Sequence, residues 1–261
     1  SHKSFRPIDM VMGPDGALYI ADWYNPIIQH GEVDFRDGRR DHGHGRIWRI
    51  TAKNRSLLNK PDYENAGIDT LLELLKAEEN WVRLFAKQEL KQRKSPSVIR
   101  SIEQWFQNLD PSDEDFEHHR VEALWALQTL GSFNEDMLKS VAGSKFPEAR
   151  AAAIRMLYHD HGKANEGLAI LERAVKDSNP QVRREAITSL GQCASVEAFQ
   201  ALLGAYGDNM EDFYEYALWR SCRLLEPYWM PAFQGGELKI EADSQALNFA
   251  LKAIDSKDAA K

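Results

Sequence analysis

The residue types best suited to chemistry gather in one polar stretch, residues 22–46. The candidates for a metal site within it are Asp22, His30, His42 and His44. Imidazole nitrogens and carboxylate oxygens are common metal ligands, but a metal usually needs three or four that converge. A loop of this length is often functional. Three interpretations stay open: a metal site, a rim for a substrate or cofactor that other residues complete, and a loop tied down by its own salt links and hydrogen bonds.

The elements that flank this stretch have the pattern of β-strands. Apolar residues alternate with others over residues 8–12, the turn Gly13-Pro14-Asp15-Gly16 follows, and residues 17–22 and 45–51 predict two further strands. Three strands form a poor independent fold because they have little to bury against. We therefore expect this β segment to belong to a larger sheet or to lie against helices.

The rest of the chain repeats one short phrase: Arg, two residues, Ala, three residues, Leu. The spacings between successive arginines are 37, 30 and 33 residues. Self-similarity at this period is typical of a solenoid of stacked helix pairs. The phrase occurs at Arg83/Ala86/Leu90, Arg120/Ala123/Leu127, Arg150/Ala153/Leu157 and Arg183/Ala186/Leu190, each preceded by one more stripe residue at Val82, His119, Ala149 and Val182.

Helical periodicity divides the repeat region into five hairpins and a terminal capping helix at 243–254. Each second helix is expected to carry the phrase, and the fifth, 212–225, has no Arg at the expected place but an apolar stripe of Phe213, Ala217 and Leu224. First helices are expected at 68–76, 97–108, 134–142, 165–176 and 196–206, and second helices are expected to begin at Asn80, near Asp115, and at Pro147, Pro180 and Asp212.

These patterns predict the fold class and the domain organisation. The chain is expected to be mainly α, an α-solenoid of about five helical hairpins preceded by a small antiparallel β segment. We predict the β segment at 1–52, a polar linker at 53–67 and the solenoid at 68–261.

The arginines of the phrase lie at the border of the apolar stripe. There the stem can pack and the guanidinium can reach a neighbour's carboxylate or carbonyl. The main interpretation of Arg83, Arg120, Arg150 and Arg183 is a structural ladder between repeats, with Asp110, Asp115 and Asp177 as candidate partners; the alternative is an anion-binding role.

Composition narrows the class of protein. The 261 residues have a formal net charge of −7 and no basic stripe, which disfavours nucleic acid as a partner. No apolar run approaches the length of a membrane span, and the start Ser-His-Lys-Ser has no charged-then-apolar leader, so we expect no signal peptide in this chain.

The chain has two cysteines, Cys193 and Cys222, both on expected second helices or their ends. They are interpreted as small buried residues, and whether they pair stays open. Because no Cys-x-x-Cys-His occurs, this chain attaches no c-type haem.

Two stretches resemble known families. The helix-pair length and the Asp-x-x-Pro-x-Val-Arg stretch at Asp177–Arg183 are similar to HEAT repeats over about residues 68–226. The stretches 5–9, 13–28 and 39–50 resemble the last β-propeller blade of the exported "membrane-bound dehydrogenase-like" proteins of planctomycetes, verrucomicrobia and some Bacteroidetes.

In that family a propeller related to soluble sugar dehydrogenases precedes HEAT repeats and often a c-type cytochrome domain. The resemblance implies that the chain is a fragment of a larger periplasmic or exported protein. It also implies no cofactor in this chain, with c-type haem or quinone only in the parent protein.

Our preferred hypothesis is a non-catalytic interaction scaffold that binds a protein partner or neighbouring domains. The alternative is a part of a propeller-type sugar or alcohol dehydrogenase, with the loop at 22–46 on its active rim. A HEAT-type bilin lyase or a cytosolic adaptor is disfavoured by the strand region. The aromatic clusters at 213–216 and 226–229 are either an exposed contact surface or packing against the terminal helix.

Overall fold

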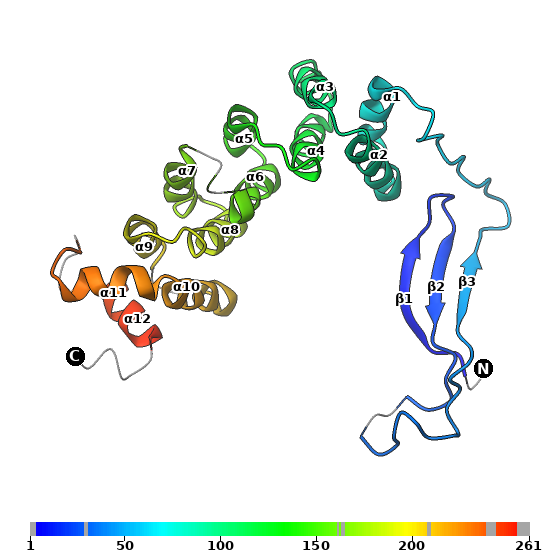
Figure 1. Cartoon of the computed structure of the whole chain (residues 1–261), viewed down its shortest axis with the longest axis horizontal. Coiled ribbons are helices and arrows are strands. Elements are labelled where there is room, and N and C mark those ends of the chain that lie inside the picture. Colours follow the sequence, from blue (N-terminus) through cyan, green and yellow to red (C-terminus); the bar gives the residue numbers. More distant parts are fainter. Residues whose placement is uncertain are drawn as a thin grey trace. The chain divides into compact units, whose positions relative to one another are not determined.

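The computed structural model describes residues 4–28, 31–160, 162, 165–207, 210–238 and 244–254 (Figure 1). The chain divides into two compact units, residues 1–89 and 90–261. Each unit is described by itself.

The first unit begins with a three-stranded antiparallel sheet in the order β1 (Pro7–Met12), β2 (Leu18–Asp22) and β3 (Arg46–Ile50). The expected turn joins β1 to β2, and the amide of Gly13 donates to the carbonyl of Ala17 across it at 2.8 Å. Gly16 adopts φ +74°, a conformation that glycine adopts without the steric cost of a side chain.

The edge strand β1 of this sheet is exposed. All six residues of β1 are exposed, whereas Ile20 of the central strand is buried. Large apolar side chains remain accessible on both edge strands, including Ile8 at 68% and Ile47 at 76% exposure.

The first unit continues into irregular chain and helices. The amide of Leu58 donates to the carbonyl of Asp15 at 2.9 Å, which ties the polar linker to the β1–β2 turn. The helices are α1 (Ile68–Glu73), the 3₁₀ turn η1 (Leu74–Lys76) and α2 (Asn80–Gln92), which extends past the boundary between the units. Buried Tyr63 packs against Phe85 of α2, with ring centroids 5.6 Å apart.

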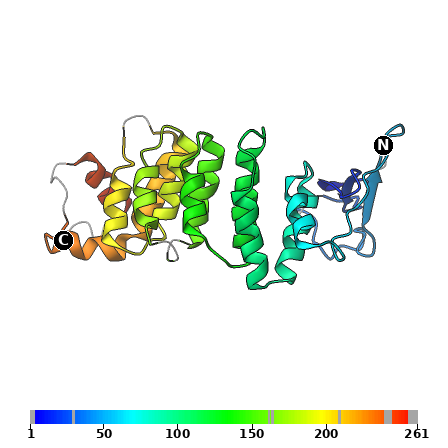
Figure 2. The same cartoon turned by 90° about the horizontal axis from the view of Figure 1, so that it is seen from above.

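The second unit consists of helical hairpins. Figure 2 shows its helices side by side, and in Figure 1 α4, α6, α8 and α10 form an inner row while α3, α5, α7 and α9 form an outer row. The hairpins are α3 (Pro96–Gln107) with α4 (Phe116–Thr129), α5 (Glu135–Ala142) with α6 (Pro147–Asp160), α7 (Gly167–Ala174) with α8 (Pro180–Leu190), and α9 (Val196–Leu203) with α10 (Asp212–Leu224), followed by α11 (Glu226–Gln234) and α12 (Gln245–Ala253).

Helix starts follow the local sequence. Asn134 and Asn179 accept hydrogen bonds from first-turn amides of α5 and α8, and Ser95, Ser195 and Ser244 do the same for α3, α9 and α12. Such caps satisfy amides that have no partner within the helix. The expected fold class, mainly α with a helical solenoid and a small antiparallel β segment, is confirmed.

The repeat phrase supplies the core. Ala86, Ala123, Ala153 and Ala186 are all fully buried, and the four leucines of the phrase have exposures of at most 1%. In the second unit each alanine lies on an inner helix, where a small side chain lets neighbouring helices approach closely. Among the residues that the structure describes, no helix is both long and apolar enough to cross a membrane.

The stripe expected for the fifth second helix is wrong. Phe213 and Leu224 are 79% and 43% exposed, and α10 instead buries Leu218, Ser221 and Cys222. Leu218 takes the place of the phrase's alanine, so Glu215 stands where the arginine would be. Because the phrase is missing here, the sequence does not show which face of α10 is buried, and the predicted stripe lies on a neighbouring face.

Part of the aromatic cluster at 226–229 lies in helix α11 and is used for packing. Trp229 of this helix is fully buried and stacks on Phe199 of α9, with centroids 4.4 Å apart and planes 5° from parallel. In the cluster at 213–216, by contrast, Tyr216 is 60% exposed.

Candidate functional site

Asp22 is the best-placed candidate ligand of the polar loop, and its carboxylate is already occupied. One oxygen accepts the amides of Arg6 at 2.8 Å and Tyr24 at 2.9 Å. The other accepts Arg46 Nε at 3.1 Å and Trp48 Nε1 at 2.9 Å. Four donors leave this side chain little capacity to bind a metal, because these hydrogen bonds would have to break first.

The charge state of Asp22 follows from these contacts. Burial opposes its ionisation, but the hydrogen bonds from Arg6, Trp48 and Tyr24 and the charge of Arg46 outweigh burial and lower the pKa to about 2. The Arg46 guanidinium also lies 3.7 Å from the centre of the Tyr24 ring. Asp22 therefore holds the ends of β2 and β3 together at neutral pH.

Arg40 organises the middle of the loop. It is 5% exposed and donates to the carbonyls of Asp34, Ile27 and Val33 at 2.8, 2.9 and 2.6 Å. A buried guanidinium that binds three carbonyls fixes the path of the chain through the loop.

The histidines of the loop lie apart from a ligand set. His44 Nδ1 is 2.9 Å from both carboxylate oxygens of Asp41, and His42 Nε2 is 3.3 Å from the carbonyl of Asp37. His30 lies outside the described residues. Across the part of the chain that the structure describes, no three His, Cys, Asp or Glu residues are grouped to hold a metal ion.

Three of the four phrase arginines bind their own hairpin turn in the same way. Arg150 Nη1 donates to the carbonyls of Ser144 and Lys145, six and five residues earlier, at 2.9 and 3.2 Å. Arg183 does the same with Asp177 and Ser178, and Arg83 with Ala77 and Glu78. These carbonyls belong to the turn that precedes each arginine's helix, and the guanidinium gives them hydrogen-bond partners.

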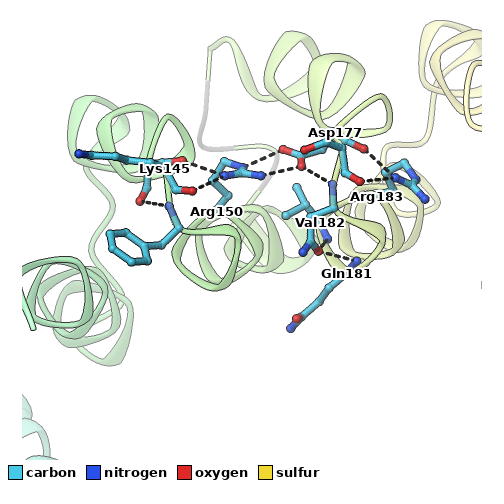
Figure 3. A network of polar contacts seen from close by, with 10 residues as sticks. Lys145, Arg150, Asp177, Gln181, Val182 and Arg183 are labelled. Atoms are coloured by element: carbon cyan, nitrogen blue, oxygen red, sulfur yellow. Dashed lines mark hydrogen bonds and ion pairs between the residues drawn. The ribbon is translucent and has the colours of Figure 1, made fainter.

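Arg150 also joins two repeats. Its Nε and Nη2 donate to the two carboxylate oxygens of Asp177 at 2.8 and 2.7 Å (Figure 3). The hydrogen bonds between the two groups raise the pKa of Arg150 and lower that of Asp177. The carbonyl of Asp177 in turn accepts from Arg183, which lies 5.6 Å from the Tyr214 ring of α10. These contacts link three consecutive hairpins.

Arg120 departs from this pattern. It pairs with Glu117 of its own helix at 2.9 Å, donates to Ser140 Oγ of α5 and lies over the rings of Phe106 and Phe116. The two other candidate carboxylates lie elsewhere. Asp110 accepts from Ser112, and Asp115 lies at the start of α4. The turn before α4 is longer than the turns before α2, α6 and α8, so its carbonyls do not take the positions that the other arginines use.

Two serines make a second link between repeats that the sequence analysis missed. Ser189 Oγ donates to the carbonyl of Ile154 at 3.2 Å, and Ser221 Oγ donates to that of Ile187 at 3.1 Å. Both serines are buried and lie 32 residues apart on successive inner helices. That spacing, close to the repeat period, is the signal that could have identified them.

The middle of the helical unit matches a known family. Residues 134–219, from the start of α5 into α10, match the HEAT repeats. This region is a HEAT-repeat solenoid. The N-terminal residues 1–54 match a domain of unknown function (DUF7133). None of the curated proteins compared with the chain matches it.

Solved structures of two engineered proteins and of a designed armadillo repeat protein are similar to the chain. One engineered protein is 16% identical, with 74% of this chain and 96% of the other covered and a TM-score of 0.38; a second is also 16% identical, with 74% and 98% covered and a TM-score of 0.42. A designed armadillo repeat protein in complex with the peptide (KR)4 is 17% identical, with 73% and 100% covered and a TM-score of 0.37.

The two cysteines, Cys193 and Cys222, are free thiols. Cys222 is fully buried in α10, and Cys193 is half-buried after α8. Burial raises the pKa of Cys193 to about 11 and that of Cys222 to about 12. Both therefore stay protonated near neutral pH, which suits packing rather than nucleophilic chemistry.

Proposed function

We propose that the chain is a non-catalytic HEAT-repeat interaction scaffold within a larger exported protein. The observation that carries this proposal is that the residues of the repeat phrase have structural roles. Its alanines and leucines are buried in the core, and its arginines make hydrogen bonds within and between hairpins. The exposed side chains of the inner helices are therefore left to contact a protein partner or a neighbouring domain.

The N-terminal sheet supports the second part of the proposal, that the chain continues a β-propeller of the exported dehydrogenase-like family. Its edge strand β1 is fully exposed and presents Ile8 and Met10 at 68% and 65% exposure. An open edge with apolar side chains is a liability that proteins usually cover. Further strands of the same protein would cover it.

The same proposal places the protein in the periplasm or outside the cell. Any c-type haem would belong to other parts of the parent protein, since this chain has no Cys-x-x-Cys-His. The resemblance to the dehydrogenase-like family is the ground for placing a quinone in those parts as well. We assign the loop at 22–46 a structural role, because Asp22 and Arg40 are engaged by neighbouring groups.

Hydrogen exchange of β1 tests this proposal. We expect the amides of residues 8–12 in β1 to exchange at least about tenfold more slowly in the protein translated from the whole reading frame than in this chain alone, because added strands would pair with the open edge. The amides of α8 are the internal control and should not change. Equal exchange of β1 in the two proteins would contradict the propeller assignment.

A further inference from the structure

A groove lies between the N-terminal parts of two neighbouring inner helices, α4 and α6. Its volume is about 260 Å³, and its apolar lining includes Val121 and Trp125 from α4 and Ala149 and Ala152 from α6. Phe146, just before α6, also lines it and is 53% exposed. The volume is below the range usual for small-molecule sites, so the groove suits one long side chain better than a cofactor.

Carboxylates surround this apolar lining. Glu114, Asp115 and Glu117 line the groove from the start of α4, and Glu148 lines it from α6. Glu117 is paired with Arg120. Among the described residues, no salt bridge joins Glu114, Asp115 or Glu148 to a cation, although the charge of Glu148 acts on Arg150. The one basic residue in the lining is His118, whose Nε2 lies 3.6 Å from Glu122.

First-turn carboxylates also stabilise the helices on which they lie, so the acidic residues alone define no site. Carboxylates next to aromatic side chains, however, favour a particular ligand, a guanidinium group. A guanidinium stacks on aromatic faces and binds carboxylates through its planar fork, whereas an ammonium is a strongly hydrated point charge. Phosphate groups would be repelled by the carboxylates.

We infer that this groove, which we call the α4–α6 groove, binds an arginine side chain of a basic segment in a protein partner. The inference rests on the proposed scaffold function and names the chemistry of the partner. The net charge of −7 favours the approach of such a segment. The segment lies along the inner row, with one arginine between Trp125 and the free carboxylates.

Peptide binding to the whole 261-residue chain tests the inference. The probe is a fluorescein-labelled peptide of ten residues with alternating serine and arginine, measured by fluorescence anisotropy. We expect this peptide to bind more tightly than the matched lysine peptide, and the matched glutamine peptide not to bind. The double variant Glu114→Gln/Glu148→Gln should lower the affinity about tenfold, and Phe146→Ala about threefold, since each removes one part of the recognition.

The matched control is Glu172→Gln/Glu197→Gln, which removes the same charge from exposed positions on α7 and α9. It should leave the affinity within about twofold of the original, because distant exposed charges are screened. An arginine peptide that does not bind, or equal losses in the groove and control variants, would overturn the inference.

Hydrogen exchange with the bound peptide separates this inference from the proposed function. Protection at 114–125 and 146–152 supports the groove. Protection confined to α8 and α10 would overturn the groove and leave the scaffold standing. The β1 exchange experiment does not involve the groove, so its result is independent.

Discussion

At the scale of single residues, the sequence identified the side chains that could bind a metal or a substrate, but not the groups that these side chains contact. Asp22 is a candidate metal ligand by its type, yet its carboxylate accepts from Arg6, Tyr24, Arg46 and Trp48. Three of these donors lie 16 or more residues away along the chain, so only the strand pairing brings them to Asp22. Local sequence therefore predicts the residue and not its partners.

The Asp22 contacts predict a pH dependence of the first unit. The pKa of Asp22 is about 2 in the folded chain and near 4 when unfolded. A lowered pKa means that its stabilisation is present above about pH 4 and is lost as the pH falls towards 2. We expect Asp22→Asn to lower the stability of the sheet at pH 7 and to reduce its loss between pH 4 and 2.

Exchange protection of β2 amides as a function of pH measures this effect. Glu32→Gln, which changes an exposed residue of the same loop, is the control and should follow the original chain. If Asp22→Asn and Glu32→Gln gave the same pH profile, the carboxylate would have no such role.

At the scale of elements, periodicity and capping predicted most helices to within one or two residues. Asn179 and Pro180 begin α8 where the sequence places its start, and Pro147 begins α6. The two failures have different causes. In α10 the phrase is missing, so nothing in the sequence defines which face of the helix is buried. Helix α11 contains Pro231, and an internal proline argues against a helix in the sequence.

The link between Arg150 and Asp177 predicts a measurable coupling between elements. Arg150→Lys keeps the charge but loses the two-pronged contact at 2.7 and 2.8 Å. We expect the free energy of unfolding to fall by about 1–2 kcal/mol. This is less than the ~1.5–3 kcal/mol usual for a hydrogen bond to a charged group, because the lysine keeps the charge. Urea unfolding followed by circular dichroism measures it.

Arg173→Lys is the matched control for this variant, because Arg173 is exposed on α7. Its free energy of unfolding should change by less than about 0.5 kcal/mol, as for other surface substitutions. A loss at Arg150 no larger than that at Arg173 would show that the contact contributes nothing to the stacking.

At the scale of the whole molecule, the repeat period predicted a solenoid, and residues 134–219 match the HEAT repeats. The α4–α6 groove could not be predicted, because its lining residues come from two helices about thirty residues apart, and the groove exists only once those helices pack.

The central claim is that the hairpins stack through the small residue of the phrase, and two neighbouring alanines of α6 test it. Ala153 is fully buried, whereas Ala152 is half-buried and lines the α4–α6 groove. The most direct measurement is the free energy of unfolding of Ala153→Leu and Ala152→Leu, since both place the same side chain in the same helix. We predict a loss of about 1–3 kcal/mol for Ala153→Leu from overpacking and little change for Ala152→Leu; equal effects of the two substitutions would contradict the stacking.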